Sequence, residues 1–253
     1  MDNSVIIRVG QGTLTFLTPE NDGQYTAHPY PVKSSMSIAA NLRVAFKEEP
    51  YLTNVGKKAV LQVATPTLLV PKEEAYPQSL PALGSAALLC KEGKDDEFCE
   101  TLYSSVITGH KGEVKCATEI EELDAVVIFP VNSDLQMVVK DHFPITSIGH
   151  VMTDVWRECY NKYYKSGGNR KLFAYFHDKM VDIFCFEQHR IRFANSFQAT
   201  HAHDALYYTL YTWKQLGMND DNDSLCVMGD MPHGDWLLER YKSYLAKVEV
   251  IRS

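Results

Sequence analysis

The order of expected strands and helices in the second half of the chain constrains the fold more than any other feature. Three runs of alternating apolar and polar residues predict consecutive antiparallel strands. They cover residues 171–176, 180–186 and 190–197, and are followed by a helix (201–216), a strand (224–228), a helix (235–245) and a strand (248–251). This β-β-β-α-β-α-β order differs from a doubly wound sheet, in which strands and helices alternate from the beginning.

The first half begins in a similar way. Residues 5–9 and 14–16 alternate around Gly10-Gln11-Gly12 and predict a hairpin, with a third strand near 24–27. The later elements are a helix capped by Ser34 or Ser35 that ends before Pro50, strands at 58–65 and 125–129, and a helix opening at Asn132 or Ser133. A last helix has residues from 152 to 163 on one face and stops near Gly167-Gly168. The sequence therefore predicts an α/β fold duplicated in two lobes, residues 1–166 and 167–253, with the boundary at Gly167-Gly168.

Composition limits the classes of partner. The 253 residues are 45% hydrophobic and 23% charged, which is ordinary for a folded protein. A formal net charge of -7 with scattered Lys and Arg argues against nucleic acid as a partner. No long apolar window and no signal-like start is present, so we expect a cytoplasmic protein without membrane insertion. The six cysteines, spaced irregularly, are expected to be buried free thiols.

Several short motifs resemble an uncharacterised bacterial family, a domain of unknown function with an actin-like ATPase (ribonuclease H-like) fold. They are Phe193–Phe197, His203–Tyr208, Trp213–Leu216, Val227–Gly229, Leu69–Pro71 and Asn41–Arg43. The resemblance covers most of the chain and implies a fold, with no established activity. Members of the wider superfamily hold ATP between two lobes, using glycine-rich hairpin turns for phosphate and a Gly-Gly turn beside the adenosine.

The three nucleotide elements implied by the resemblance can be located here. The first turn keeps Gly10, Gly12 and Thr13 but has Arg8 about where the superfamily carries an aspartate, so metal binding is expected to be lost. The second turn, 176–180, contains Asp178 and no glycine, so its side chains are expected to block phosphate. The adenosine position keeps the single glycine Gly229.

Two other groups of residues suggest alternative chemistry. His201 and His203 could bind a metal with Asp178, Asp182, His177 or His189, but their place at a helix start favours a structural role. Asp178 and Asp182 could form a carboxylate pair, yet as residues of one strand they would lie about 13 Å apart. The acidic run Asn219–Asp223 lacks a calcium loop's glycine and glutamate and predicts a solvated loop.

These observations favour a non-catalytic binding or scaffold protein, a pseudo-ATPase on an actin-like fold, with no catalytic residues, no metal and no cofactor. Its partner would be a protein. Tyr207, Tyr208, Tyr211 and Trp213 surround one helix, and core and interlobe packing is the first explanation of such aromatic residues. An exposed aromatic patch for a protein partner is the second, because Tyr and Trp are favoured at interface centres. The alternative is a divergent ATP-binding enzyme or phosphotransferase with Mg-ATP. Its candidate residues are Gly10, Gly12, Thr13, Thr15, Asp178, Asp182 and Gly229.

Overall fold

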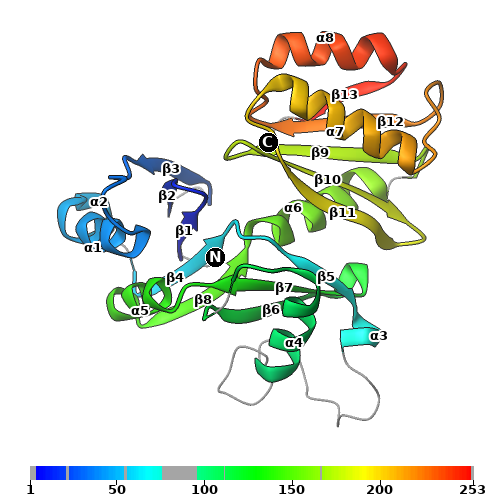
Figure 1. Ribbon diagram of the computed structural model, residues 1–253. Coiled ribbons are helices and arrows are strands. Elements are labelled where there is room, and N and C mark those ends of the chain that lie inside the picture. The colour runs from blue at the N-terminus through cyan, green and yellow to red at the C-terminus, as the bar shows by residue number, and fades with distance from the viewer. Residues whose placement is uncertain are drawn as a thin grey trace. The chain divides into compact units, whose positions relative to one another are not determined.

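The computed structural model describes residues 4–20, 23–53, 56–75, 96–110, 112–165 and 167–251. The chain forms two compact units. The first unit contains residues 1–120 and 126–155, and the second contains residues 121–125 and 156–253. Each unit has a five-stranded sheet of its own (Figure 1).

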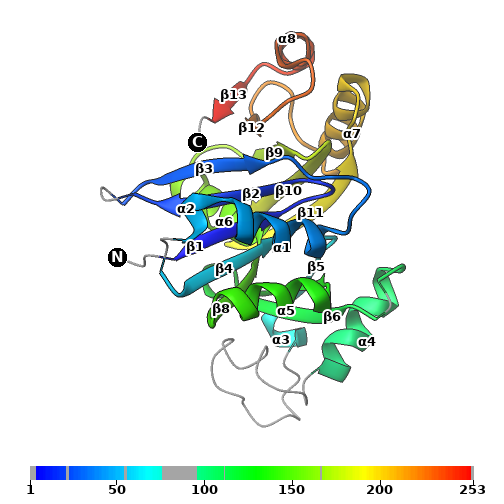
Figure 2. The same ribbon diagram turned by 90° about the vertical axis from the view of Figure 1, so that its left-hand side faces the viewer.

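The sheet of the first unit has the strand order β3-β2-β1-β4-β8. Its strands are β1 (Val5–Val9), β2 (Leu14–Pro19), β3 (Tyr25–Tyr30), β4 (Lys58–Val63) and β8 (Ile145–His150). The first three strands are antiparallel, whereas β4 runs parallel to β1 and β8 parallel to β4. Helices α1 (Ile38–Glu48), α2 (Pro50–Thr53) and α5 (Ser133–His142) pack against this sheet (Figure 2).

Strict alternation in β1 explains how this sheet is packed. Val5, Ile7 and Val9 are buried and share a face with Phe16 of β2, whose ring contacts Phe46 of α1. The opposite face carries Ile6 and Arg8, both partly exposed. One apolar face covered by helices fixes the register, because a shift by one residue would turn every buried side chain outward.

Residues 64–132 form an insertion between β4 and α5. It contains β5 (Leu68–Pro71), α3 (Lys72–Ala75), α4 (Asp96–Val106), β6 (Val114–Ile120), a 3-10 turn (Glu121–Leu123) and β7 (Ala125–Val131). The three strands make a second small sheet in the order β5-β7-β6. Tyr103 of α4 is fully buried in its core, with Val126 and Ile128 of β7.

The sheet of the second unit has the order β11-β10-β9-β12-β13. Its strands are β9 (Lys171–His177), β10 (Met180–Glu187), β11 (Arg190–Gln198), β12 (Ser224–Gly229) and β13 (Val248–Ile251). Helices α7 (Ala202–Gln215) and α8 (Gly234–Tyr244) pack on each other and on one face of the sheet (Figure 1). Trp213 and Tyr241 are the largest buried side chains of this core.

Both sheets therefore have the same arrangement: three antiparallel strands, then two parallel strands added on the side of the first strand. This confirms the predicted α/β class and the predicted duplication. The expected boundary at Gly167-Gly168 stays a prediction. Helix α6 (Val151–Cys159) continues as a π-helix (Tyr160–Tyr164), within the range predicted as a single helix.

Some predicted boundaries were wrong for physical reasons. Helix α1 is capped by Ser37, whose side chain accepts the Ala40 N–H, and not by Ser34 or Ser35. Helix α8 begins after His233, and Asp235 lies in its first turn. The edge strand β8 was missed because its sequence, Ile-Thr-Ser-Ile-Gly-His, has few apolar residues. Cys90, one of the six cysteines, lies outside the described residues.

Candidate functional site

The first hairpin turn joins β1 to β2. The Gly10 N–H donates to the Thr13 carbonyl oxygen at 3.1 Å, which closes the turn. Of its two glycines only Gly12 has a positive φ, at +78°, and a Cβ added there would meet no atom within 4 Å. The space beside the Gly12 backbone is therefore open, whereas a role of this turn in ligand binding stays a prediction.

Arg8 lies one residue before the end of β1, on the partly exposed face. Its guanidinium Nη2 donates to Gln62 Oε1 at 3.2 Å, and Gln62 Nε2 donates to Asp154 Oδ2 at 2.6 Å. Thr15, a candidate for the alternative function, is the cross-strand neighbour of Arg8. The strand end thus presents a cation that is hydrogen-bonded to an amide, in a position where a magnesium site would need a carboxylate.

A cavity of about 350 Å³ opens beside this turn. It is bounded by the carboxyl ends of β1 and β4 and by the first residues of α1 and α5. Asn132 caps α5 by accepting the Leu135 N–H at 3.1 Å, as Ser37 caps α1. Among the residues that the structure describes, the ionisable side chains that line the cavity are His110, Glu113 and Asp134.

The second hairpin turn joins β9 to β10 and contains no glycine. Asp178 and Lys179 both adopt the left-handed conformation, with φ of 45° and 62°. Two positive φ values define the type of tight turn that normally selects Asn-Gly or Gly-Gly. The second turn therefore adopts this tight-turn geometry without a glycine. Its two left-handed residues carry side chains, whereas Gly12 of the first turn has none.

The predicted separation of Asp178 and Asp182 was wrong, because the turn folds the chain back between them. His177 Nε2 makes a short contact with Asp182 Oδ2, and His177 Nδ1 lies 3.5 Å from Asp178 Oδ2. Ser196 on β11 donates to the other Asp182 oxygen. Both carboxylates thus hold one imidazole, an arrangement that residue spacing within a single strand could not predict.

The electrostatics of this cluster favour a charged histidine. Burial lowers the pKa of His177, but hydrogen bonds to Asp178 and Asp182 and the charges of both carboxylates outweigh burial and raise it to about 9. The imidazolium is therefore protonated at neutral pH and neutralises part of the acidic charge. The second turn is closed by an internal ion pair.

Gly229 ends β12 and has a structural reason to be glycine. Its φ is +84°, and a Cβ would lie 2.1 Å from the Phe176 carbonyl oxygen, the same oxygen that accepts the Asp230 N–H. A second cavity, of about 310 Å³, lies beside Asp178 and Lys179 of the turn and Asp230–Pro232 after β12. The structure thus brings two of the predicted residues, Asp178 and Gly229, to neighbouring segments of one unit.

The histidines considered for a metal site lie at the start of α7. His201 is the N-cap residue without a side-chain cap bond, and the His203 ring packs 4.6 Å from the ring of Trp236. Within the described ranges, no group of three or more His, Cys, Asp or Glu side chains has an arrangement that could hold a metal. A metal hydrolase centred on these histidines gains no support from this geometry.

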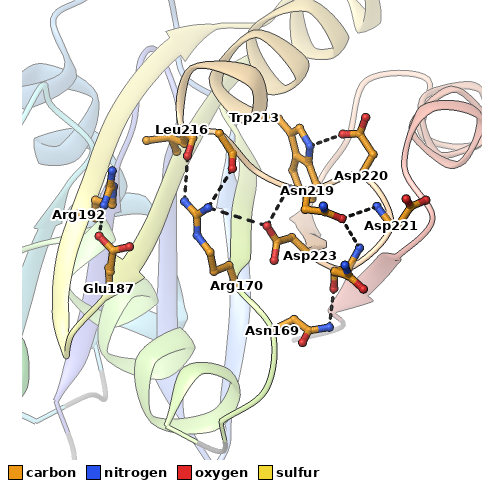
Figure 3. A network of polar contacts seen from close by, with 12 residues as sticks. Asn169, Arg170, Glu187, Arg192, Trp213, Leu216, Asn219, Asp220, Asp221 and Asp223 are labelled. Carbon is orange, nitrogen blue, oxygen red and sulfur yellow. Dashed lines mark hydrogen bonds and ion pairs between the residues drawn. The ribbon is translucent and has the colours of Figure 1, made fainter.

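The acidic run after α7 is an ordered turn, and the prediction of a merely solvated loop was incomplete. Asn219 Oδ1 accepts the N–H groups of Asp221 and Asn222, and Asp223 Oδ2 accepts that of Asn219 (Figure 3). Asp220 Oδ1 accepts from Trp213 Nε1 at 2.8 Å. These oxygens accept hydrogen bonds from donors of the protein itself, so the run is a structural turn of the second unit and not a calcium-binding loop.

The described cysteines agree with the sequence analysis. Cys99, Cys116, Cys159, Cys185 and Cys226 are free and buried. Burial raises the pKa of Cys185 to about 11 and that of Cys226 to about 12, so neither is a thiolate at neutral pH. No helix in the described part of the chain combines the length and apolar character needed to cross a bilayer.

Comparison with solved structures identifies the fold. A protein from Bacteroides thetaiotaomicron with an actin-like ATPase fold and unknown function is similar, with a TM-score of 0.81 and 22% identity over 98% of this chain and 90% of that one. The PilM-PilN type IV pilus biogenesis complex is also similar, with a TM-score of 0.60 and 10% identity over 99% and 88%. At these identities the likeness establishes an actin-like ATPase fold and no more.

Comparison with protein families gives a match of more than half the chain. Residues 88–248 match the model described as Protein of unknown function (DUF3822), which bears out the expected resemblance to an uncharacterised family. No curated protein matches the chain. The chain therefore belongs to the DUF3822 family of proteins of unknown function and has an actin-like ATPase fold.

Proposed function

We propose that this protein is a non-catalytic binding or scaffold protein whose nucleotide site is degenerate. Its actin-like fold supplies two hairpin turns of the kind that hold phosphate in ATP-binding relatives. In this chain both turns lack a group that the chemistry needs, and each has a side chain that opposes it. We infer that the fold is used for binding a protein and not for hydrolysing ATP.

The observation that carries this proposal is the charge at the end of β1. Magnesium bound to a nucleotide requires oxygen ligands at about 2.0–2.1 Å, usually with one or two protein carboxylates. Arg8 offers a guanidinium, already hydrogen-bonded to Gln62, and therefore repels the metal. At the second turn, the Asp178 carboxylate repels a phosphate, and side chains stand at both left-handed positions, where a glycine would leave the backbone accessible.

A divergent ATP-dependent enzyme or phosphotransferase is the alternative. It is favoured by the cavity beside Gly10, which lies at the carboxyl ends of parallel strands, where open α/β sheets commonly bind ligands. Gly12, Thr13, Thr15, Asp178, Asp182 and Gly229 would then serve the nucleotide. Asp182 would be the residue most needed, because it is a buried carboxylate on a rigid strand.

A phosphate-release assay separates the two functions. Purified protein is incubated with Mg-ATP and compared with the Asp182→Asn variant and with a blank. The proposal predicts the same background rate in all three. A rate above background in the wild type that falls in Asp182→Asn would favour the enzyme and overturn the proposal.

The outer surface of α7 is our proposed site for a protein partner. Tyr207 and Tyr211 are 61% and 50% exposed and stack with ring centroids 5.8 Å apart. The exposed residues His203 and Lys214 flank them, and the acid of this helix, Asp204, is only partly exposed, although the chain has a net charge of -7. The surface thus suits an apolar patch rimmed by acidic residues on another protein. The PilM-PilN complex is an example of an actin-like relative that works with a protein.

Site-specific photocrosslinking in cells tests this surface. A photoreactive phenylalanine at Tyr211 should give a defined adduct, whereas the same residue at Tyr244 of α8 should not. Tyr244 is a matched control because it is 57% exposed and lies on the neighbouring helix. Equal adducts at both positions, or none at Tyr211, would contradict the assignment.

A further inference from the structure

Strand β11 forms one edge of the sheet in the second unit. Among the strands that the structure describes, β10 is the one that pairs with it. It spans nine residues, whereas the strand at the opposite edge, β13, spans four described residues. It also contains no proline, whereas the edge strand β3 of the first unit contains Pro29. Short length and proline commonly protect a sheet edge from pairing with another chain, and β11 has neither protection.

The hydrogen bonds at the end of β11 show which of its backbone groups face the open edge. The Ala199 N–H donates to the Lys179 carbonyl oxygen at 2.8 Å. In an antiparallel pair the bonded positions alternate, so Phe197 and Asn195 direct their backbone groups towards β10. The residues between these positions direct theirs to the open edge. They are Ala194, Ser196 and Gln198.

A side chain covers one of these outward donors. The Ser196 N–H donates to Oδ1 of the neighbouring Asn195 at 2.9 Å, which agrees with an N–H that faces away from β10. Both residues are exposed. A carbonyl group of an added strand can replace this side-chain oxygen, because both accept the same hydrogen bond.

A bulge limits the regular part of the strand. The pairing of β10 with β11 shifts between Cys185 and Phe186, where Phe193 lies opposite Cys185 and Ile191 lies opposite Phe186. Bulges bend a strand and interrupt its pairing. The part of β11 that can accept a further strand is therefore 193–198.

Exposed rings of α7 continue from this edge. Helix α7 packs on β10 and β11 and runs back over the sheet from the end of β11 (Figure 1). The Phe197 ring stacks on Tyr208 with centroids 4.6 Å apart. Tyr208 contacts Tyr207 at 5.4 Å, and Tyr207 stacks on Tyr211. A strand added to β11 would direct every second side chain to this face of the sheet, beside the exposed tyrosines.

The charges along the edge favour an acidic partner. The sequence has no acid between Glu187 and Asp204, and this stretch includes Arg190 and Arg192. Arg192 pairs with Glu187 (Figure 3), and Arg190 pairs with Asp124 at 2.8 Å, with all four side chains exposed. Exposed ion pairs contribute little stability, so carboxylates of a partner can replace these two acids. A second copy of the chain would bring its own basic stretch to the same edge, which disfavours self-pairing.

We propose that β11 binds an extended, acidic segment of a partner protein by strand addition. The backbone of the segment pairs with the outward groups of 194–198. Its apolar side chains pack on Tyr207 and Tyr211, and its carboxylates face Arg190 and Arg192. This inference rests on the proposed function, in which the surface of α7 binds a protein, and it adds the backbone conformation and the charge of the bound segment.

The test begins with a probe of unbiased sequence. A displayed library of random peptides is selected against the full chain, with counter-selection against Gln198→Pro. Proline at this position removes an outward N–H and leaves the hydrogen bonds to β10 in place. We expect the enriched peptides to alternate apolar and polar residues, to contain Asp or Glu, and to lack proline. No enrichment, or enrichment of basic or proline-rich peptides, would overturn the inference.

The enriched peptide is then titrated by fluorescence anisotropy, with circular dichroism as a check that each variant is folded. Gln198→Pro should weaken binding about tenfold, because one backbone hydrogen bond is lost. Asn195→Ala should strengthen binding about threefold, because its side chain no longer competes for the Ser196 N–H. An increase in affinity cannot come from a variant that merely disturbs the strand. Unchanged binding to Gln198→Pro, or weaker binding to Asn195→Ala, would overturn strand addition.

Two further variants separate this failure from failure of the proposed function. Tyr211→Ser should weaken peptide binding, whereas Tyr244→Ser on α8 should leave it unchanged. A peptide whose binding depends on Tyr211 and not on Gln198 would remove strand addition alone and leave α7 as a partner surface. A peptide that depends on neither, with no photocrosslink at Tyr211, would contradict both proposals.

Sedimentation velocity of the wild type without peptide tests the second copy as the occupant. We expect a single species that Gln198→Pro does not change. A dimer that dissociates in Gln198→Pro would show that β11 pairs with itself, and would overturn the inference.

Discussion

The two units share one strand order but build their first hairpin turns from different residues. In the first unit, Gly12 has open space around it and Arg8 lies near the end of the strand that precedes the turn. In the second unit, Asp178 and Lys179 take up left-handed conformations and His177 joins two carboxylates beneath them. The strand order depends on apolar faces that pack on helices, so the turns can change completely while the fold stays the same.

The helices that follow the hairpins also differ. Helix α1 has a serine cap, whereas α7 starts at His201 without a side-chain cap. At the other end of α7, Arg170 donates to the carbonyl oxygens of Leu216 and Gly217, at 2.9 and 3.0 Å (Figure 3). Side-chain hydrogen bonds thus stabilise the first turn of α1 in the first unit and the last carbonyl groups of α7 in the second unit. Each difference gives a pair of matched variants.

The largest effect is expected for glycine replacement. Gly229→Ala places a Cβ 2.1 Å from the Phe176 oxygen and should destabilise the second unit by about 3 kcal/mol. Gly12→Ala has the same left-handed strain but open space, and should cost about 1 kcal/mol. Chemical denaturation followed by tryptophan fluorescence suits Gly229→Ala, because Trp156, Trp213 and Trp236 all lie in the second unit.

For Gly12→Ala, hydrogen exchange in β1 and β2 gives the corresponding value for the first unit. If both variants lose the same free energy of unfolding, the close approach of Gly229 to Phe176 does not contribute to the effect.

The next effect is a pH dependence confined to the second unit. The folded-state pKa of His177, about 9, lies above the value of about 6.5 in an unfolded chain, so the folded state binds more protons between these limits. The stabilisation is complete below about pH 6.5 and is lost as pH rises through about 9. Its full size is about 3.5 kcal/mol, from a difference of about 2.5 between the two pKa values at about 1.4 kcal/mol per pKa unit.

The measurement is the free energy of unfolding at pH 7 and at pH 9.5 for the wild type and for His177→Gln. The wild type should lose more stability over this interval than the variant. His203→Gln, on α7, serves as the control and should behave as the wild type does. A parallel loss in wild type and His177→Gln would show that the imidazole is not charged by its two neighbours.

A smaller effect is expected at the end of α7. Arg170→Ala removes two hydrogen bonds to helix-terminal carbonyls and should cost about 1–2 kcal/mol. Arg192→Ala removes an exposed ion pair with Glu187 and should cost less than about 0.5 kcal/mol. Tryptophan fluorescence during urea denaturation reports both. If the two arginines prove equivalent, the hydrogen bonds of Arg170 contribute no more stability than an exposed ion pair does.

The smallest effects concern the helix starts themselves. Ser37→Ala should destabilise α1 by about 1 kcal/mol, because the Ala40 N–H loses its acceptor. His201→Ala should leave α7 unchanged, since His201 makes no side-chain cap bond. Hydrogen exchange of the first-turn amides in both helices gives the comparison. Faster amide hydrogen exchange in the first turn of α7 in His201→Ala would show that the His201 side chain stabilises this helix, which would contradict the prediction.

The same contrast between units explains what could be predicted. In the second unit, each strand has either clean alternation or a continuous apolar run, and Gly217 ends the helix region, so the element order was recovered. In the first unit, β6 carries the buried Lys115 and β8 is a polar edge strand, and neither has the pattern of a typical strand. Periodicity cannot identify a strand whose inward residue is a lysine, even though the carbonyl oxygens of His110 and Glu113 satisfy its ammonium group.

The candidate site was predicted unevenly for a related reason. Arg8 and the missing glycines could be read from residue identity alone, because those arguments need no distances. The contacts of His177 with Asp178 and Asp182 depend on where the hairpin turns, and the His110–Glu113 pair depends on how the insertion folds. Such groupings arise from the tertiary fold, for which residue spacing gives no signal.

Calorimetric titration of the purified wild-type protein with Mg-ATP tests the central claim most directly. We predict heats equal to those of dilution at every nucleotide concentration up to the millimolar range, because Arg8 opposes the metal and the His177 ion pair closes the second turn. A saturable isotherm with a micromolar dissociation constant would contradict the claim, and would show that the two turns still hold a nucleotide.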